Sequence, residues 1–216
     1  MAIEEQLRAG LSTLRLDLDD HQINQLLDYQ NLIGKWTRVY NLTAVRDPAE
    51  MVTHHLLDSL AAIAPLQRYL QKAGLDQAST LLDVGSGAGL PGVVIAICCP
   101  TVVVTCVDSV AKKAAFMKQA ALALKLPNLR GLHARVESIQ QPFDVICSRA
   151  FASLADFTQW STGALAAQGG WLAMKGKHPA DELATLPATV QVFHVEQLQV
   201  PGLDAERCIV WMRKND

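Results

Sequence analysis

The sequence has 216 residues, of which 50% are hydrophobic and 19% are charged. This composition suffices for one sizeable core and excludes disorder over most of the length, because disordered chains are apolar-poor and charge-rich. The formal net charge of −2 does not indicate a bulk-charge nucleic-acid binder, but residues 109–150 carry seven Lys/Arg against two Asp/Glu, a local net charge of +5. That segment is either a basic patch or a set of solvated helix faces.

The cysteines and the apolar runs bear on the cellular compartment. The five cysteines are odd in number and form no Cys-x-x-Cys motif, which predicts a reducing compartment with neither a disulfide framework nor a zinc site. The N-terminus has no long apolar region, so we predict no signal peptide. Apolar runs such as 93–99 are far shorter than the roughly 20 residues that a membrane span needs. We therefore expect a cytoplasmic protein without a membrane segment.

Residues 3–72 show apolar spacings of three and four, which predict helices. The first helix carries Leu7 to Leu18, the second begins after Asp19 or Asp20 and runs to Trp36, and the third runs from Asp47-Pro48 to Leu66. We expect residues 1–75 to form a helical extension that packs on a catalytic core at 76–216. No long linker separates the two parts, so we expect them to share one hydrophobic core.

From residue 79 onward, short apolar or β-branched runs alternate with helical patterns. Strands are predicted at 80–84, 102–107, 129–134, 143–147, 170–174, 190–195 and 208–212, and helices at 91–99, 110–124 and 154–166. The continuous run 102–107 is typical of a strand that is buried on both faces. This order predicts an α/β fold, a Rossmann-like, doubly wound and mostly parallel sheet.

The strongest motif is Asp83-Val84-Gly85-Ser86-Gly87-Ala88-Gly89-Leu90-Pro91-Gly92, which follows a predicted strand and opens a predicted helix. Glycines let a backbone turn sharply and approach a ligand closely. In an open α/β sheet, ligands bind at the carboxyl ends of the strands, where this loop lies. The motif therefore predicts a cofactor-binding loop.

Two cofactors compete for this loop. Gly87-x-Gly89-x-x-Gly92, with Asp108 further along, matches a dinucleotide fingerprint and so allows an NAD-dependent oxidoreductase. However, a pyrophosphate beside the Asp83 carboxylate is electrostatically poor, and the chain has no room for a separate hydride-acceptor domain. S-adenosylmethionine, a cationic nucleoside without phosphate, suits an acidic strand end better.

Further motifs resemble one methyltransferase family. They are Trp36-x-x-x-Tyr40-Asn41-Leu42-Thr43, His54-His55-Leu56-Leu57-Asp58-Ser59-Leu60, the glycine loop, Asp108-Ser109, Ala134-Arg135-Val136-Glu137, Ser148-Arg149-Ala150-Phe151 and Lys175-Gly176. Together they resemble the RsmG family (glucose-inhibited division protein B) of S-adenosylmethionine-dependent 16S rRNA guanine-N7 methyltransferases. The resemblance runs from about residue 20 to 212. The glycine loop alone indicates only the superfamily, and we carry over no functional residue from beyond Gly176.

The resemblance implies methyl transfer to N7 of a guanine, guanine 527, in 16S rRNA within the small ribosomal subunit or an assembly intermediate. S-adenosylhomocysteine is the expected product, and a monomer the expected state. The implied cofactor residues are Gly85, Gly87 and Leu90 for the methionine and ribose, Asp108 for the ribose hydroxyls, Val136 and Glu137 for the adenine, and Arg149. Whether Arg149 serves cofactor, RNA or both is left open. Asp108 also occupies the place of the ribose-binding acid of nucleotide folds.

Guanine N7 carries a free lone pair, so the reaction needs little acid–base help and rests mainly on in-line positioning, with reacting atoms roughly 3–3.5 Å apart. Arg149 and Lys175 are the candidates to select guanine through O6. Phe151 is the candidate platform on which a splayed-out base stacks.

Several side chains allow either a functional or a structural interpretation. Adjacent residues on a helix diverge by about 100°, so we predict no metal at His54-His55 and expect a structural role. We expect Asp58 to pair with a polar group between the two parts, and Asn41 and Thr43 to form a turn beside the glycine loop. Asp83 either contacts the cofactor or orients the loop.

Lys112 and Lys113 either contact phosphate or are solvated, and Trp36, Tyr40 and Trp160 are expected in the core. Three functional alternatives also stay open, namely a small-molecule methyltransferase, an NAD-dependent oxidoreductase and a non-catalytic RNA-binding module.

Overall fold

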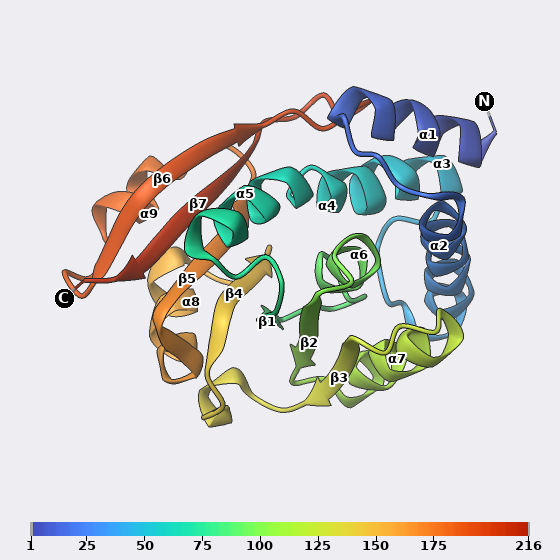
Figure 1. Cartoon of the computed structure of the whole chain (residues 1–216). Coiled ribbons are helices and arrows are strands. Elements are labelled where there is room, and N and C mark those ends of the chain that lie inside the picture. Colours follow the sequence, from blue (N-terminus) through green and yellow to red (C-terminus); the bar gives the residue numbers. More distant parts are fainter. Residues whose placement is uncertain (1, 216) are drawn as a thin grey trace.

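A seven-stranded sheet forms the centre of the computed structural model, which describes residues 2–215 (Figure 1). The strand order is β3-β2-β1-β4-β5-β7-β6, and β7 runs in the direction opposite to that of the other six strands. The strands are β1 (Ser79–Val84), β2 (Val102–Asp108), β3 (Leu129–His133), β4 (Phe143–Arg149), β5 (Leu165–Lys175), β6 (Val190–Leu198) and β7 (Arg207–Lys214). The predicted Rossmann-like, mostly parallel α/β sheet is confirmed.

The helices cover both faces of this sheet. They are α1 (Ile3–Leu14), α2 (Asp20–Tyr40), α3 (Pro48–Met51), α4 (Asp58–Leu60), α5 (Ile63–Ala73), α6 (Gly92–Cys98), α7 (Ala111–Ala123), α8 (Leu154–Ser161) and α9 (Ala180–Ala184). A π-helical segment η1 (Val52–Leu57) joins α3 to α4, and 3-10 turns lie at η2 (Val136–Ser138) and η3 (Thr162–Ala164). No helix within residues 2–215 is long and apolar enough to cross a membrane.

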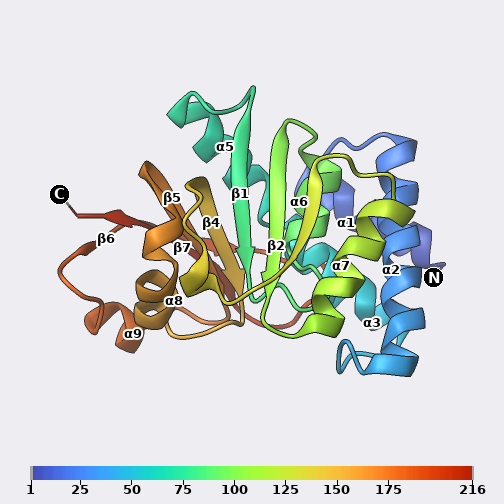
Figure 2. The ribbon, with the colours of Figure 1, turned by 90° about the horizontal axis from the view of Figure 1, so that it is seen from below.

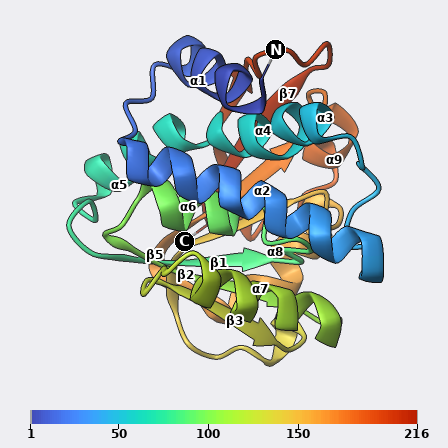
Figure 3. The ribbon, with the colours of Figure 1, turned by 90° about the vertical axis from the view of Figure 1, so that its right-hand side faces the viewer.

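Alternate residues of each central strand enter two hydrophobic clusters, as the period of two requires. On one face, Leu81 packs with the apolar sides of α1 to α7. On the other face, Leu82 packs with α8, η2 and η3. The N-terminal helices and the sheet therefore share one core, and Figure 3 shows α2 lying across α6 with α4 and α1 above it.

The elements before residue 75 form largely where the pattern predicts them. The Asp19 carboxylate accepts a hydrogen bond from the backbone N–H of Gln22 at 2.8 Å, which fixes the start of α2. The first helix ends at Leu14, before Leu18, where Arg15 adopts a left-handed conformation. The predicted continuous helix from Asp47 to Leu66 is wrong, because the backbone there passes through the wider π-helical turn η1 and is interrupted again at Ala61-Ala62.

Three further predictions need correction. The helix predicted at 154–166 ends at Ser161, because the chain turns through η3 and Leu165 already pairs with Phe143 in the sheet. β2 is not buried on both faces along its whole length, since Val103 near its start is 37% exposed. The short helix α9 was not predicted. It lies between β5 and β6 and brings Glu182 to the end of β5.

The carboxyl ends of β1, β2 and β4 lie at one edge of the sheet (Figure 2). The C-terminal end of α2 and the loop that follows it reach the same edge. The glycine loop after β1, Asp108 at the end of β2 and Arg149 at the end of β4 are thereby brought together although they are far apart in the sequence.

Candidate active site

The glycine loop joins β1 to α6 in a conformation that ordinary residues seldom adopt. Gly85, Gly87 and Gly89 have φ angles of 66°, 59° and 85°. A Cβ atom on Gly85 would lie 2.2 Å from the Phe151 ring, so this position has no room for a side chain. The backbone N–H of Gly85 donates to the carbonyl of Val107 at 2.9 Å, which ties the loop to β2.

Asp83 lies beneath this loop and has no exposed surface. Its Oδ2 accepts a hydrogen bond from the backbone N–H of Gly92 at 2.9 Å, at the start of α6. Burial raises the pKa of the Asp83 carboxyl to about 6. Of the two roles considered for Asp83, the structure supports the one that orients the loop, because the side chain has no exposed surface and accepts from the backbone at the start of α6.

Two cavities meet at Gly85 and Ala150, which line both. The smaller, of about 400 Å³, lies over the ends of β1 and β2. The larger, of about 510 Å³, lies between the glycine loop, η1 and the end of β4. The arrangement offers one compartment for a nucleoside and an adjoining one for a second reactant.

Asp108 lines the smaller cavity and is 6% exposed. Its Oδ1 accepts from the backbone N–H of Val110 at 2.9 Å and its Oδ2 from that of Gly87 at 3.1 Å. Each carboxylate oxygen can accept a further hydrogen bond. The Lys113 ammonium lies 3.8 Å from Oδ2, so this lysine faces Asp108, whereas Lys112 is exposed.

Val136 and Glu137 line the same cavity as Asp108, as the prediction for an adenine site requires. Glu137 pairs with Arg135 at 3.1 Å, and hydrogen bonds to its own backbone and to Arg135 lower the pKa of its carboxyl. Phe151 also lines this smaller cavity and not the larger one, so its predicted role as a platform for the target base gains no support. Trp160, expected in the core, is 38% exposed and meets Phe151 edge to face.

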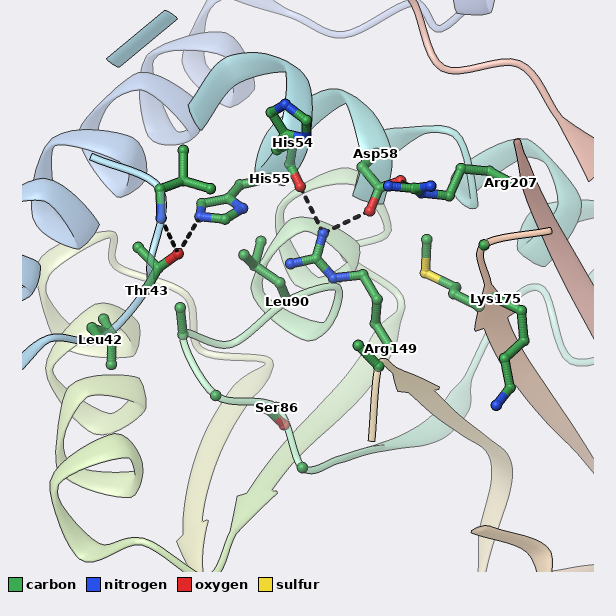
Figure 4. A pocket seen from close by; sticks show the side chains of 17 residues that line it. Leu42, Thr43, His54, His55, Asp58, Ser86, Leu90, Arg149, Lys175 and Arg207 are labelled. Carbon is green, nitrogen blue, oxygen red and sulfur yellow. Dashed lines mark hydrogen bonds and ion pairs between the residues drawn. The ribbon is translucent and has the colours of Figure 1, made fainter. Parts of the chain in front are cut away.

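The Arg149 side chain lines the larger cavity (Figure 4). Its Nη1 donates to Asp58 Oδ2 at 2.7 Å and to the backbone carbonyl of His54 at 2.9 Å. The second carboxylate oxygen of Asp58 accepts from Arg207 Nε at 2.9 Å. Asp58 thus joins the helical part to β4 and β7, as expected of a pairing residue, and holds two guanidinium groups beside the cavity.

The helical side of the cavity is built by η1 and the loop after α2. His55 Nε2 lies 2.8 Å from Thr43 Oγ1, and both residues line the cavity together with the glycine loop. Desolvation lowers the pKa of the His55 imidazole to about 4, so the ring is neutral at physiological pH. Because Leu42 and Thr43 line the same cavity as the glycine loop, the predicted turn at Asn41–Thr43 lies beside that loop. No group of three or more metal-ligating side chains occurs within residues 2–215.

Lys175 lines the larger cavity through part of its side chain, but its ammonium points elsewhere (Figure 4). Nζ donates to both carboxylate oxygens of Glu182, at 2.8 and 3.0 Å, and to the carbonyl of Ala152 at 2.9 Å. Arg207 instead presents a second cation at the cavity. The motifs gave no sign of Arg207, because it precedes an apolar strand in the part of the chain from which no residue was carried over.

Comparisons with known proteins identify the family. The family model described as rRNA small subunit methyltransferase G matches residues 22–210. A protein named ribosomal RNA small subunit methyltransferase G from Polaromonas sp. (strain JS666) is 79% identical over 97% of this chain and 93% of its own length. A protein of the same name from Polaromonas naphthalenivorans is 74% identical over 99% of both.

Solved structures agree on the fold. A SAM-dependent methyltransferase from Aquifex aeolicus superposes with a TM-score of 0.55 at 18% identity, covering 77% of this chain and 98% of that one. TrmN from Thermus thermophilus superposes with a TM-score of 0.53 at 22% identity, covering 69% of this chain and 48% of that one. The chain belongs to the rRNA small subunit methyltransferase G family and is an S-adenosylmethionine-dependent rRNA methyltransferase.

Proposed function

We propose that this enzyme methylates N7 of guanine 527 in the 16S rRNA of the small ribosomal subunit or an assembly intermediate, acting as a monomer in the cytoplasm. The observation that carries the proposal is Arg149, whose guanidinium is held by Asp58 and the His54 carbonyl beside a cavity that opens onto the glycine loop. A fixed cation beside the cofactor loop suits a base with acceptors at N7 and O6.

The proposed cofactor residues line both cavities. Gly85, Gly87 and Leu90 line the larger one and would surround the methionine and ribose part, and Asp108 in the smaller one has acceptor capacity left for ribose hydroxyls. Val136 and Glu137 line the adenine side. The buried Asp83 below the loop suits a cation and disfavours a pyrophosphate, which argues against NAD. When bound, S-adenosylmethionine supplies a methyl group on a sulfonium that leaves as a neutral thioether.

The protein's part in this reaction is positioning. N7 has a free lone pair, so a general base is unnecessary, and the neutral His55 imidazole is not required to move a proton. Arg149 and Arg207 orient the guanine and its phosphate, and Asp58 keeps both guanidiniums in place. Lys175 would assist only after its ammonium leaves Glu182. Holding the reacting atoms in line is worth several orders of magnitude in rate.

The direct test uses S-adenosylmethionine labelled in its methyl group and small subunits from a strain that lacks this gene. Digestion of the rRNA should release one labelled nucleoside, 7-methylguanosine. The Arg149→Ala variant should remain folded and transfer no label. A different labelled nucleoside, or transfer only to a small molecule, would contradict the proposal. Near-normal turnover by Arg149→Ala would remove this residue from the site.

A further inference from the structure

A separate pocket of about 380 Å³ lies between the C-terminal half of α2 and the start of α3. Its lining residues are Gln30, Asn31, Gly34, Lys35, Thr37, Arg38, Arg46, Pro48 and Met51. Three of them are cations, and none is a carboxylate. The nearby Asp47 carboxylate is engaged at the start of α3, where it accepts from the backbone N–H groups of Ala49 and Glu50. The pocket therefore favours an anionic ligand.

One short loop links this pocket to the larger cavity of the active site. Leu42, Thr43 and Val45 line the active-site cavity, whereas Arg46 in the same loop lines the separate pocket and donates to Asn41 Oδ1 at 2.7 Å. Both the loop and the end of α2 lie at the edge of the sheet where the strands end (Figure 2). A polymer that enters the active site can thus reach the pocket with its next residues.

Gly34 keeps the pocket open. It lies inside α2, where glycine is less favourable than alanine. A Cβ atom at Gly34 would meet no atom of the described residues within 4 Å, whereas one at Gly10 would lie 2.4 Å from Leu57. Packing within the protein therefore requires glycine at position 10 but not at position 34. The missing side chain at Gly34 leaves space for a ligand.

The end of α2 also presents apolar surface to solvent. Tyr40, expected in the core, is 44% exposed, and its neighbour Val39 is 70% exposed. The Tyr40 ring lies against Trp36, with ring centroids 5.1 Å apart, so its position is supported. Tyr40 does not line the pocket, but it lies at the end of the same helix that carries Lys35 and Arg38. Proteins that bind single-stranded nucleic acid combine exposed aromatic rings, on which bases stack, with cations that meet the phosphates.

We propose that this pocket and Tyr40 bind successive nucleotides of the rRNA strand next to the target guanosine. Lys35, Arg38 and Arg46 contact a phosphate in the pocket, and Tyr40 stacks on the base of a neighbouring nucleotide. The inference rests on the proposed function, since it names the part of the RNA substrate that the enzyme holds outside the active site. In a protein of net charge −2, such local cations are needed to hold an RNA strand.

The decisive variant is Gly34→Leu, which fills the pocket while leaving every charge in place. Leucine favours helix, so the variant should unfold at or above the wild-type temperature, and its affinity for S-adenosylmethionine should be unchanged. We expect the KM for small subunits to rise at least about tenfold with kcat retained, which is the effect of losing a contact made equally in ground and transition state. Tyr40→Ala should raise this KM about 5- to 100-fold.

A second measurement tests the contribution of the cations to phosphate binding, separately from the space in the pocket. The affinity of Lys35→Ala/Arg38→Ala for protein-free 16S rRNA, measured by filter retention, should depend less on salt. The slope of log affinity against log salt should fall by roughly 0.7 for each lost contact to a single strand. Lys72→Ala, an exposed lysine in the last turn of α5, is the matched control and should match the wild type.

The outcomes are distinct. Wild-type KM values for both Gly34→Leu and Tyr40→Ala, in an enzyme that produces 7-methylguanosine, would overturn this inference and leave the proposed function intact. Loss of affinity for intact subunits but not for protein-free rRNA would assign the pocket to a ribosomal protein and also overturn it. Absence of methyl transfer by the wild type would instead refute the proposed function.

Discussion

Asp58→Ala removes the carboxylate that holds two arginines beside the larger cavity of the proposed active site. Asp58 is 3% exposed and accepts from Arg149 at 2.7 Å and from Arg207 at 2.9 Å. Removing one partner of a fully buried ion pair costs about 3–5 kcal/mol. The side chains of Arg149 and Arg207 are 19% and 25% exposed, so hydration of their guanidinium groups offsets part of this cost. We expect the free energy of unfolding to fall by about 2–4 kcal/mol. In a chain of this size, that lowers Tm by about 5–15 °C.

Calorimetry measures the loss of stability. Methyl transfer, assayed at 25 °C where the variant remains folded, measures the loss of activity. We expect a large loss of turnover, because Arg149 keeps only the His54 carbonyl as a partner. Glu4→Ala is the matched control, since Glu4 also pairs with an arginine at 2.8 Å but in solvent, and it should change stability by less than about 1 kcal/mol. Unchanged Tm and turnover in Asp58→Ala would refute the reasoning.

Three further changes test other parts of the site. Asp108→Ala should weaken S-adenosylmethionine binding by roughly 10- to 100-fold in calorimetric titration; an equal loss of RNA affinity would exclude the ribose role. Gly85→Ala should abolish cofactor binding, because its Cβ would meet Phe151 and its φ is 66°; wild-type affinity would show that the loop adapts. His55 has a folded pKa of about 4 against 6.5 unfolded, so its stabilising contribution is complete above pH 6.5 and is lost as pH falls toward 4. The stability difference between wild type and His55→Gln should therefore shrink by up to about 3 kcal/mol between pH 6.5 and 4, as measured by urea unfolding. The comparison must be made against this variant, because the raised pKa of Asp83 gives the opposite slope between pH 3.8 and 6. A difference that is constant with pH would contradict a neutral, buried His55.

The arrangement of the glycine loop and Asp108 in the candidate site was predictable because its determinants are local in sequence. The glycine loop follows directly on β1, and Asp108 ends the next strand, so recognising the strand–helix alternation is enough to place both. Parallel pairing then brings their ends together, with Asp83 opposite Cys106. The shared hydrophobic core follows equally from the apolar spacing of the N-terminal helices.

The larger cavity of the candidate site depends on contacts between distant segments. Arg207 reaches Asp58 across 149 residues, because β7 pairs antiparallel with β5 and places Cys208 opposite Lys175. No local pattern encodes that register. The direction of Lys175 likewise follows from Glu182 on α9, a helix too short to show a period.

Other misses concern the ends and the winding of helices. A π-helical turn has the same apolar side chains as an α-helix, so the pattern at Val52–Leu57 cannot reveal the change in hydrogen bonding. Tyr40 keeps the apolar period of α2, but the helix extends beyond the core it covers. Periodicity thus identifies the face of a helix and not where the core ends.

The central claim is methylation of guanine N7 in the small-subunit rRNA, and the direct measurement is made on rRNA from cells. A strain lacking this gene is complemented with the wild-type gene or with Arg149→Ala, and its 16S rRNA is reduced and treated with aniline, which cleaves at 7-methylguanosine. We predict cleavage at guanine 527 with the wild-type gene alone. Cleavage at 527 without the gene, or equal cleavage with both versions, would contradict the account.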